Sequence, residues 1–441
     1  MTLPAIVASA LAARIDAAAR TVEPRVVEWR RDLHAHPELG NREFRTSGIV
    51  AEHLRRLGLD SVRTGVAHTG VVGVLVGGKP GPVVALRADM DALPVTEEVD
   101  VPFASKARTQ WNGEEVGVMH ACGHDMHTAI LMGVAEVLAS LKADLRGTVK
   151  FIFQPAEEMP PKGEDGGAKM MIAEGAMESP KPEAVFGLHV TSRLPLGTIG
   201  YRPGPAMASS DTLEISVRGR QTHGAMPWFG VDPIVTAAQV VLGLQTVVSR
   251  QVDLTREPAV VTIGAIKGGN RGNIIPDQVD MQGTIRTFDE EMRDDVHDRV
   301  KTLAEAIGKG ARAHCAVCIN KNYPVTVNDP ELTAAMAPTL GRVAGAGKAM
   351  VVPKVMGSED FSFFQRVVPG LFFFVGVVPP GQAVDKAAPN HSPRFHPDEG
   401  CLVLGVRALA NVACDYLEAR SASTAFVPPK ANELESMARA K

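Results

Sequence analysis

The sequence predicts an α/β protein in which a mostly parallel sheet is flanked by helices and a second, smaller domain is inserted. Three observations support this fold class. Strand-like and helix-like segments alternate up to about residue 190. The order then changes to β-α-β-β-α-β, which is typical of a ferredoxin-like domain, and the first pattern returns afterwards. We therefore predict a larger domain made of residues 1–198 and 322–441, and an inserted domain at 199–321.

The larger domain is expected to combine buried strands with amphipathic helices. Apolar residues between 130 and 141 recur at a helical spacing, whereas short continuous apolar runs indicate strands that are covered on both faces. The strands are expected at residues 70–77, 81–95, 147–158, 183–190 and 371–377. The helices are expected within residues 24–60, 125–142, 166–177, 358–367 and 399–420, followed by a polar tail after Ser423.

The inserted domain is expected to have half-exposed strands, because its apolar residues alternate with polar ones. Asp232 and Pro233 have the residue types of a helix cap and a first helical position. The Cys-x-x-Cys pair at 315–318 falls in a strand-like run, so we interpret it as two buried or half-buried thiols and not as a redox or zinc motif. The strands are expected at 211–219, 258–269, 277–288 and 313–320, and the helices at 232–250 and 289–308.

Composition limits the possible partners. The formal net charge is −4 with 22% charged residues, and no block dense in lysine or arginine indicates a nucleic-acid partner. No apolar run reaches the roughly 18 residues of a membrane-spanning helix. The N-terminus lacks the basic region of a secretory signal. Five sparse cysteines do not suggest a disulfide framework, so we predict a cytoplasmic protein without nucleic-acid or membrane partners.

Potential metal ligands follow several of the predicted strands. Glu158 ends one strand, His189 ends another, and Asp89 and Asp91 end a third. Three histidines, one cysteine and one aspartate lie within residues 120–127, where a loop that contains residues 122–124 leads into a helix. Since sites in α/β sheets form outside the carboxyl ends of the strands, these segments are expected to meet at one edge. The sequence therefore predicts a metal site there.

Nine motifs in order between residues 30 and 395 give the chain a specific resemblance to a known family. The motifs are RRDLHAHPELG, ALRADMDALPV, MHACGHDMHTA, FIFQPAEE, GLHV, THGAMPWFGVDP, GNIIPD, GSEDFSFF and NHSPRF. With them the chain resembles the M20 metallopeptidases and amidohydrolases, in the branch of hippurate hydrolases, N-acyl-amino-acid amidohydrolases and IAA-amino acid hydrolases.

The resemblance implies a zinc-peptidase-like catalytic domain that holds two divalent metal ions per chain (Zn, Mn, Co or Ni). Glu157 takes the place of the family's general base, which moves a proton between water and the leaving nitrogen. Five ligands give each ion three contacts only if one ligand is shared, and a thiolate can bridge. The implied ligands are Cys122, His124, Glu158, His189 and His391.

The resemblance also gives roles to the inserted domain, as a lid over the substrate and as a dimerisation surface. His223 matches a histidine that polarises the substrate carbonyl, often from the partner subunit, and Asn273 matches an asparagine that contacts substrate. The chain is thus expected to be a homodimer or higher homo-oligomer. Trp228 stands where many relatives have a histidine, which leaves His223 unaffected. Asp89 is expected to orient a ligand.

The expected reaction is metal-dependent hydrolysis of the amide bond of a small-molecule N-acyl amino acid. One alternative is a dipeptidase or aminopeptidase of the same family. Another is an inactive binding relative, against which the presence of Glu157 and all five ligands argues. A third is a structural zinc protein, although ligands spread over most of the chain are unlike a compact closed zinc cluster.

Overall fold

The structure, a computed structural model, describes residues 8–111 and 113–423. Within them the chain divides into two compact units. The first consists of the residues up to Gly204, Asn328–Val352 and the residues from Phe363 onward. The second consists of Pro205–Val327 and Pro353–Ser362. From the sequence, Pro353–Ser362 was predicted to belong to the larger domain. The polar tail predicted after Ser423 lies outside the described residues.

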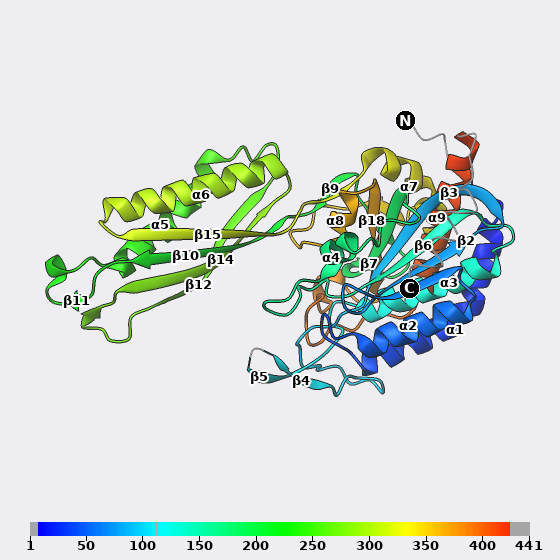
Figure 1. Ribbon diagram of the computed structural model, residues 1–441, viewed down its shortest axis with the longest axis horizontal. Helices are drawn as coiled ribbons and strands as arrows, with labels where there is room; N and C mark the ends of the chain where they lie inside the picture. The colour runs from blue at the N-terminus through cyan, green and yellow to red at the C-terminus, as the bar shows by residue number, and fades with distance from the viewer. Residues whose placement is uncertain (1–7, 112, 424–441) are drawn as a thin grey trace. The chain divides into compact units, whose positions relative to one another are not determined.

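The first unit is built on an eight-stranded sheet in the order β1-β2-β6-β3-β7-β18-β8-β17 (Figure 1). Neighbours are parallel from β6 through β3 and β7 to β18, and again at β8/β17. They are antiparallel at β1/β2, β2/β6 and β18/β8. The predicted α/β class is therefore confirmed. The strands are β1 (Ser61–Val66), β2 (Gly70–Val76), β3 (Lys79–Asp89), β6 (Arg146–Gln154), β7 (Ala184–Pro195), β8 (Ile199–Tyr201), β17 (Ala349–Val351) and β18 (Gly370–Val378).

Helices cover the sheet of the first unit. Strand β18 is buried at every residue, as expected for a strand with both faces covered. The N-terminal helix α1 and the C-terminal helix α9 pack against each other and against α3 (Figure 1). The sequence patterns did not predict β1, which is short and contains a glycine. They also did not predict α7, a helix whose pattern is interrupted by proline and glycine. The helices are α1 (Ala12–Ala35), α2 (Phe44–Arg56), α3 (His124–Ser140), α4 (Gly167–Ala173), α7 (Pro330–Ala344) and α9 (Cys401–Ser423).

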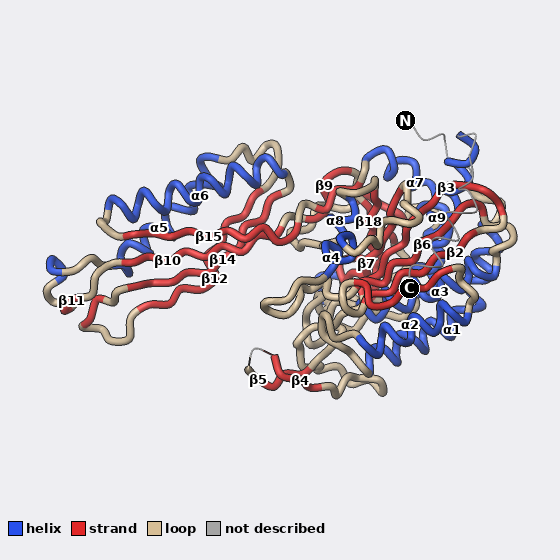
Figure 2. Tube along the Cα trace, viewed as in Figure 1, coloured by secondary structure: helices blue, strands red, loops and turns tan. Residues whose placement is uncertain are grey.

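The second unit has the predicted βαββαβ order. Its four-stranded sheet runs β12-β14-β10-β15 and is antiparallel at β12/β14, β14/β10 and β10/β15. Helices α5 and α6 pack against each other and against the sheet, so both cover one face (Figure 2). The elements are β10 (Ser210–Arg218), α5 (Pro233–Thr246), β12 (Ala259–Gly268), β14 (Gln278–Thr287), α6 (Glu290–Gly310) and β15 (His314–Tyr323).

Two local predictions for the second unit have different outcomes. Asp232 caps α5, since its side chain accepts hydrogen bonds from the amides of Ile234 and Val235. Cys315 is buried, but Cys318 is exposed, so the expectation of burial is wrong for the second thiol. Residues three apart in a strand point to opposite faces, which explains the difference.

None of the helices in the described part of the chain combines the length and the apolar character that crossing a bilayer requires.

A buried histidine joins α1 to the neighbouring segments of the first unit. His34 Nδ1 lies 2.8 Å from an Asp125 oxygen and its Nε2 lies 3.0 Å from a Glu97 oxygen. Burial by itself lowers the pKa of His34, but Asp125 and Glu97 outweigh it and raise the pKa to about 9. His34 thus carries a buried positive charge between two carboxylates.

We expect this charge to make stability pH-dependent. Because the pKa of His34 is higher in the folded than in the unfolded chain, its contribution is present below about pH 6.5 and is lost as the pH rises through 9. The loss should be on the order of 3 kcal/mol. Urea denaturation between pH 6 and 10 should show it for the wild type and for the control His36→Gln, but not for His34→Gln. An unchanged pH dependence in His34→Gln contradicts the assignment.

Candidate metal centre

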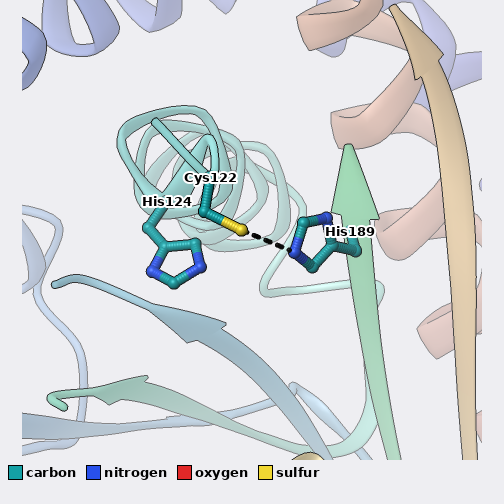
Figure 3. Close-up of side chains that lie close together, drawn as sticks. All are labelled: Cys122, His124 and His189. Carbon is teal, nitrogen blue, oxygen red and sulfur yellow. Dashed lines mark hydrogen bonds between the residues drawn. The ribbon is translucent and has the colours of Figure 1, made fainter. Parts of the chain in front are cut away.

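The structure brings the five predicted metal ligands together in the first unit. Cys122 lies just before α3, and His124 is the first residue of that helix. His189 lies on β7, Glu158 follows β6, and His391 precedes α9. Their ligand atoms form two groups, each within 4.8 Å, and both groups contain Cys122. Figure 3 shows the sulfur of Cys122 pointing toward the His189 ring, with His124 on its other side. The two groups are Cys122–His124–His189 and Cys122–Glu158–His391.

A glycine allows the α3 segment to approach β7. Gly123, between the two ligands of this segment, has φ +98°, in the left-handed region that favours glycine. A Cβ atom added there would lie 2.4 Å from Cγ2 of Val190. The close approach places Sγ of Cys122 3.3 Å from Nε2 of His189 and 3.3 Å from Nε2 of His391. The thiol is therefore the shared member of the site.

The imidazoles present Nε2 to the site. Nδ1 of His189 lies 2.7 Å from the Val190 carbonyl oxygen and donates to it, so Nε2 keeps its lone pair. Burial lowers the pKa of His189 well below its usual value, which favours the neutral, metal-binding form. Nδ1 of His124 lies 3.2 Å from Oδ1 of Asp91, and its buried Nε2 has no hydrogen-bond partner among the described residues. A bound cation would satisfy this nitrogen.

The electrostatics of the site also fit a cation. Burial, followed by the charges of Glu158 and Glu157, raises the pKa of the Cys122 thiol well above its usual value. In the ion-free chain this thiol would hold its proton. A divalent ion reverses that preference, because it stabilises the thiolate that binds it. The mixed sulfur, nitrogen and oxygen donors suit Zn, Mn, Co or Ni.

The turn after β6 carries the two adjacent glutamates that the sequence singled out. Strand geometry ends at Gln154, and Ala156 and Met159 have φ +51° and +77°. Left-handed backbone costs a residue with a Cβ roughly 1–2 kcal/mol. Glu157 is 6% exposed, and one of its oxygens lies 4.0 Å from Nε2 of His124. The turn thus lets both neighbouring carboxylates reach the site, as the sequence predicted.

Two acids and a histidine beside the ligands make hydrogen bonds that hold the site together. Asp89 was expected to orient a ligand, and its Oδ1 lies 3.8 Å from Nδ1 of His124, while Asp91 makes the closer hydrogen bond to that nitrogen at 3.2 Å. The hydrogen bonds of Asp89 come from Arg87 at 2.5 Å and from Nδ1 of His127 at 2.6 Å. Nε2 of His127 accepts from the Val190 amide, so both of its nitrogens are engaged. We therefore regard His127 as structural support beneath the ligands.

Asn390 connects three segments of the site, and sequence analysis did not identify it. Its Nδ2 donates to the carbonyl oxygens of Cys122 at 2.9 Å and of Val190 at 3.2 Å. The next amide, that of His391, donates to the Ala121 carbonyl oxygen at 2.7 Å. This backbone contact fixes the loop that carries His391, whose φ of +72° is also left-handed. The NHSP motif contained the signal, but its contacts depend on the fold.

The second unit brings the two predicted substrate residues together at a two-stranded ribbon, β11 (Thr222–His223) and β13 (Ile274–Ile275): His223 ends β11 and Asn273 directly precedes β13. The Gly224 amide donates to the Asn273 carbonyl oxygen at 2.8 Å. The Ala225 amide donates to Nδ1 of His223 at 3.0 Å, so the ring proton lies on Nε2. His223 is exposed and offers an N–H donor. Their contact with substrate stays a prediction.

Comparison with known proteins gives the family. The profile of Peptidase family M20/M25/M40 matches residues 85–415. Thermostable carboxypeptidase 2 of Saccharolobus solfataricus is 41% identical, over 90% of this chain and 96% of its own. N-acetylcysteine deacetylase of Bacillus subtilis is 37% identical, over 89% and 97%. IAA-amino acid hydrolase ILR1-like 4 of Arabidopsis thaliana is 38% identical, over 93% and 89%.

A solved structure of a protein from the M20 family is also similar to this chain. The YXEP protein of Bacillus subtilis, called a dinuclear metal binding peptidase from the M20 family, is 35% identical with a TM-score of 0.76. The match covers 90% of this chain and 99% of that one.

The fold and the ligand clusters define a metal-dependent hydrolase that acts on amide bonds. The chain belongs to the M20 family of peptidases and amidohydrolases. The predicted family and the prediction of metal cofactors are confirmed.

Proposed function

We propose that the protein hydrolyses amides whose amine fragment is an amino acid with a free carboxylate, and that N-acyl amino acids are its substrate class. The observation that carries the proposal is the pair of ligand groups that share Cys122, with the buried carboxylate of Glu157 beside them. The names of the deacetylase and IAA-amino acid hydrolase relatives denote substrates of this kind.

The proposed centre holds two divalent ions, which would polarise the substrate carbonyl and lower the pKa of a water. Cys122 would contact both ions. His124 and His189 would complete one set of ligands, and Glu158 and His391 the other. The charge of two divalent ions exceeds that of one thiolate and one carboxylate. The excess favours a substrate that carries an anionic carboxylate.

Glu157 is proposed as the general base and acid. It would accept a proton from the attacking water and deliver it to the leaving nitrogen, which must be protonated to depart as an amine. Burial of Glu157 supports this role because few competing waters surround the carboxylate.

His223 and Asn273 are proposed as substrate residues. His223 would donate from Nε2 to the carbonyl oxygen, where negative charge develops in the transition state. Asn273 would orient the substrate through its side-chain amide. Closure of the second unit as a lid would exclude water during the reaction.

A carboxypeptidase is the second candidate, favoured by the 41% identity to thermostable carboxypeptidase 2. The chemistry is the same, because a carboxypeptidase also releases an amino acid with a free carboxylate. The two functions differ in the acyl fragment, which is a small acid for an N-acyl-amino-acid hydrolase and a peptide for a carboxypeptidase.

A substrate screen tests the proposal. We expect hydrolysis of acetyl-, benzoyl- or indole-acyl amino acids, loss of activity with a chelator, and recovery to different extents with Mn²⁺, Co²⁺, Ni²⁺ or Zn²⁺. Methyl esters of the same substrates, which lack the free carboxylate, serve as controls and should react poorly. Faster cleavage of peptides than of N-acyl amino acids would favour the carboxypeptidase. Full activity in a chelated sample that metal analysis shows to be free of metal would contradict a metal-dependent reaction.

Homodimerisation through the second unit is also proposed. Helix α5 exposes Ile234, Val235 and Leu242, with Leu242 72% exposed. Strand β12 lies at an edge of its sheet and exposes Ile266. Exposed apolar side chains beside an unpaired strand edge are typical of an interface.

Sedimentation velocity tests the dimer. The wild type should sediment as a dimer, and Leu242→Lys should shift it toward the monomer because a charge would be buried at the interface. Val351→Lys changes an exposed apolar residue of the first unit and should leave the dimer intact. A monomeric wild type would contradict the proposal.

The cysteines support a cytoplasmic location as part of the proposal. All five are free thiols. Free thiols persist in the reducing cytoplasm, whereas secreted proteins more often form disulfides.

A further inference from the structure

The turn that carries Glu157 and Glu158 is anchored at both ends by carboxylates from other segments. Oε1 of Glu43 accepts a hydrogen bond from the Ala156 amide at 2.9 Å. Oδ2 of Asp91 accepts one from the Glu158 amide at 2.9 Å. The two amides lie on either side of Glu157, so its backbone is fixed from both directions.

Glu43 is itself held in place. It is the residue before α2, its side chain is 0% exposed, and its carbonyl oxygen accepts from the Ser47 amide at 2.8 Å. Thr69 Oγ1 donates to Oε2 of Glu43 at 2.5 Å. Each carboxylate oxygen of Glu43 therefore has a donor, one from Thr69 and one from the turn. A side chain fixed at both oxygens can act as a rigid support.

The turn requires such support because Ala156 has a left-handed backbone, with φ +51°. A residue with a Cβ leaves this region unless its surroundings hold it there. Ala156 is fully buried, and a Cβ atom added to Gly40 would lie 3.1 Å from its Cα. The segment before α2 thus packs directly on the turn and supplies the acceptor for its amide.

We propose that Glu43 is a positioning residue for Glu157: its hydrogen bond to the Ala156 amide holds the turn in the conformation that directs the Glu157 carboxylate for proton transfer. This inference rests on the proposed function. Glu158 has a separate anchor in Asp91, so loss of the Glu43 contact should affect proton transfer more than metal binding.

A matched pair of substitutions separates the hydrogen bond from side-chain volume. Glu43→Gln keeps a carbonyl oxygen for the Ala156 amide and an NH₂ group that can donate to Thr69. Burial and the charge of Asp91 raise the pKa of Glu43, so a neutral amide is a close substitute for the acid. Glu43→Met has a similar length but no such acceptor.

The kinetic results should differ between the two variants. Glu43→Gln should keep kcat within about threefold of the wild type, and Glu43→Met should lose about 100-fold in kcat with KM changed by less than about threefold. Metal analysis should find the same metal content in both. Adding Ala156→Gly to Glu43→Met should recover about tenfold, since glycine adopts a left-handed backbone without strain. Equal kcat in the Gln and Met variants would overturn the proposal.

Amide hydrogen exchange gives a readout that does not depend on turnover. In the metal-loaded protein, the Ala156 amide should exchange slowly in the wild type and in Glu43→Gln, and faster in Glu43→Met. Equal protection in all three would overturn the role of Glu43. If the wild type hydrolyses no N-acyl amino acid, the proposed function fails, while the exchange rates still decide whether Glu43 holds the turn.

Discussion

Glu157→Gln is expected to reduce kcat by about 10³-fold while the protein keeps its metal. The amide has the size of the carboxylate but cannot accept a proton from water, so the loss should fall on the chemical step. Glu157 is grouped with His124 and Glu158 but belongs to neither of the two ligand groups that share Cys122, so we expect those two groups to hold the ions without it. Steady-state kinetics and metal analysis of the same sample provide the measurement.

Glu158→Gln is the matched control, because it changes the adjacent carboxylate in the same way. Its oxygen lies 2.9 Å from Nε2 of His391, in one of the ligand groups. This variant should lose metal as well as activity. Unchanged turnover in Glu157→Gln would refute its role as the base.

Cys122→Ala is expected to lower the metal content from two ions per chain to about one or fewer. The reason is that the thiol belongs to both ligand groups, whereas each histidine that contacts it belongs to one. Removing it leaves each group with two side chains, which is too few to hold either ion tightly. Elemental analysis after dialysis measures the change, and activity should fall with it.

Cys318→Ser is the control for general effects of cysteine removal. Cys318 is an exposed thiol on β15 of the second unit and takes part in none of the ligand groups. Its substitution should leave the metal content unchanged. Two firmly bound ions in Cys122→Ala would contradict the shared thiolate.

Sequence analysis predicted the ligand cluster because ligands at the carboxyl ends of parallel strands meet at one edge of the sheet. Glu158 and His189 are on segments of this kind. The alternating pattern of strands and helices was sufficient for that inference, since it alone indicates the sheet. The family resemblance then added His391, whose loop carries no periodic signal, and the role of Cys122 as the shared ligand.

The supporting residues could not be predicted in the same way. Glu43 and Asn390 are separated by more than a hundred residues from the backbone groups that they bind, and local sequence does not encode such contacts. The roles of Asp89 and Asp91 were also not separable from sequence. Both end the same strand region with the same side chain, and only the fold shows that Asp91 makes the hydrogen bond to His124 and Asp89 the one to His127.

Anomalous X-ray scattering from crystals of the metal-loaded protein locates the ions directly. We expect two ions per chain, both bound to Sγ of Cys122, with His124 and His189 on one and Glu158 and His391 on the other. A single ion, or two ions that do not share the sulfur, would contradict this arrangement.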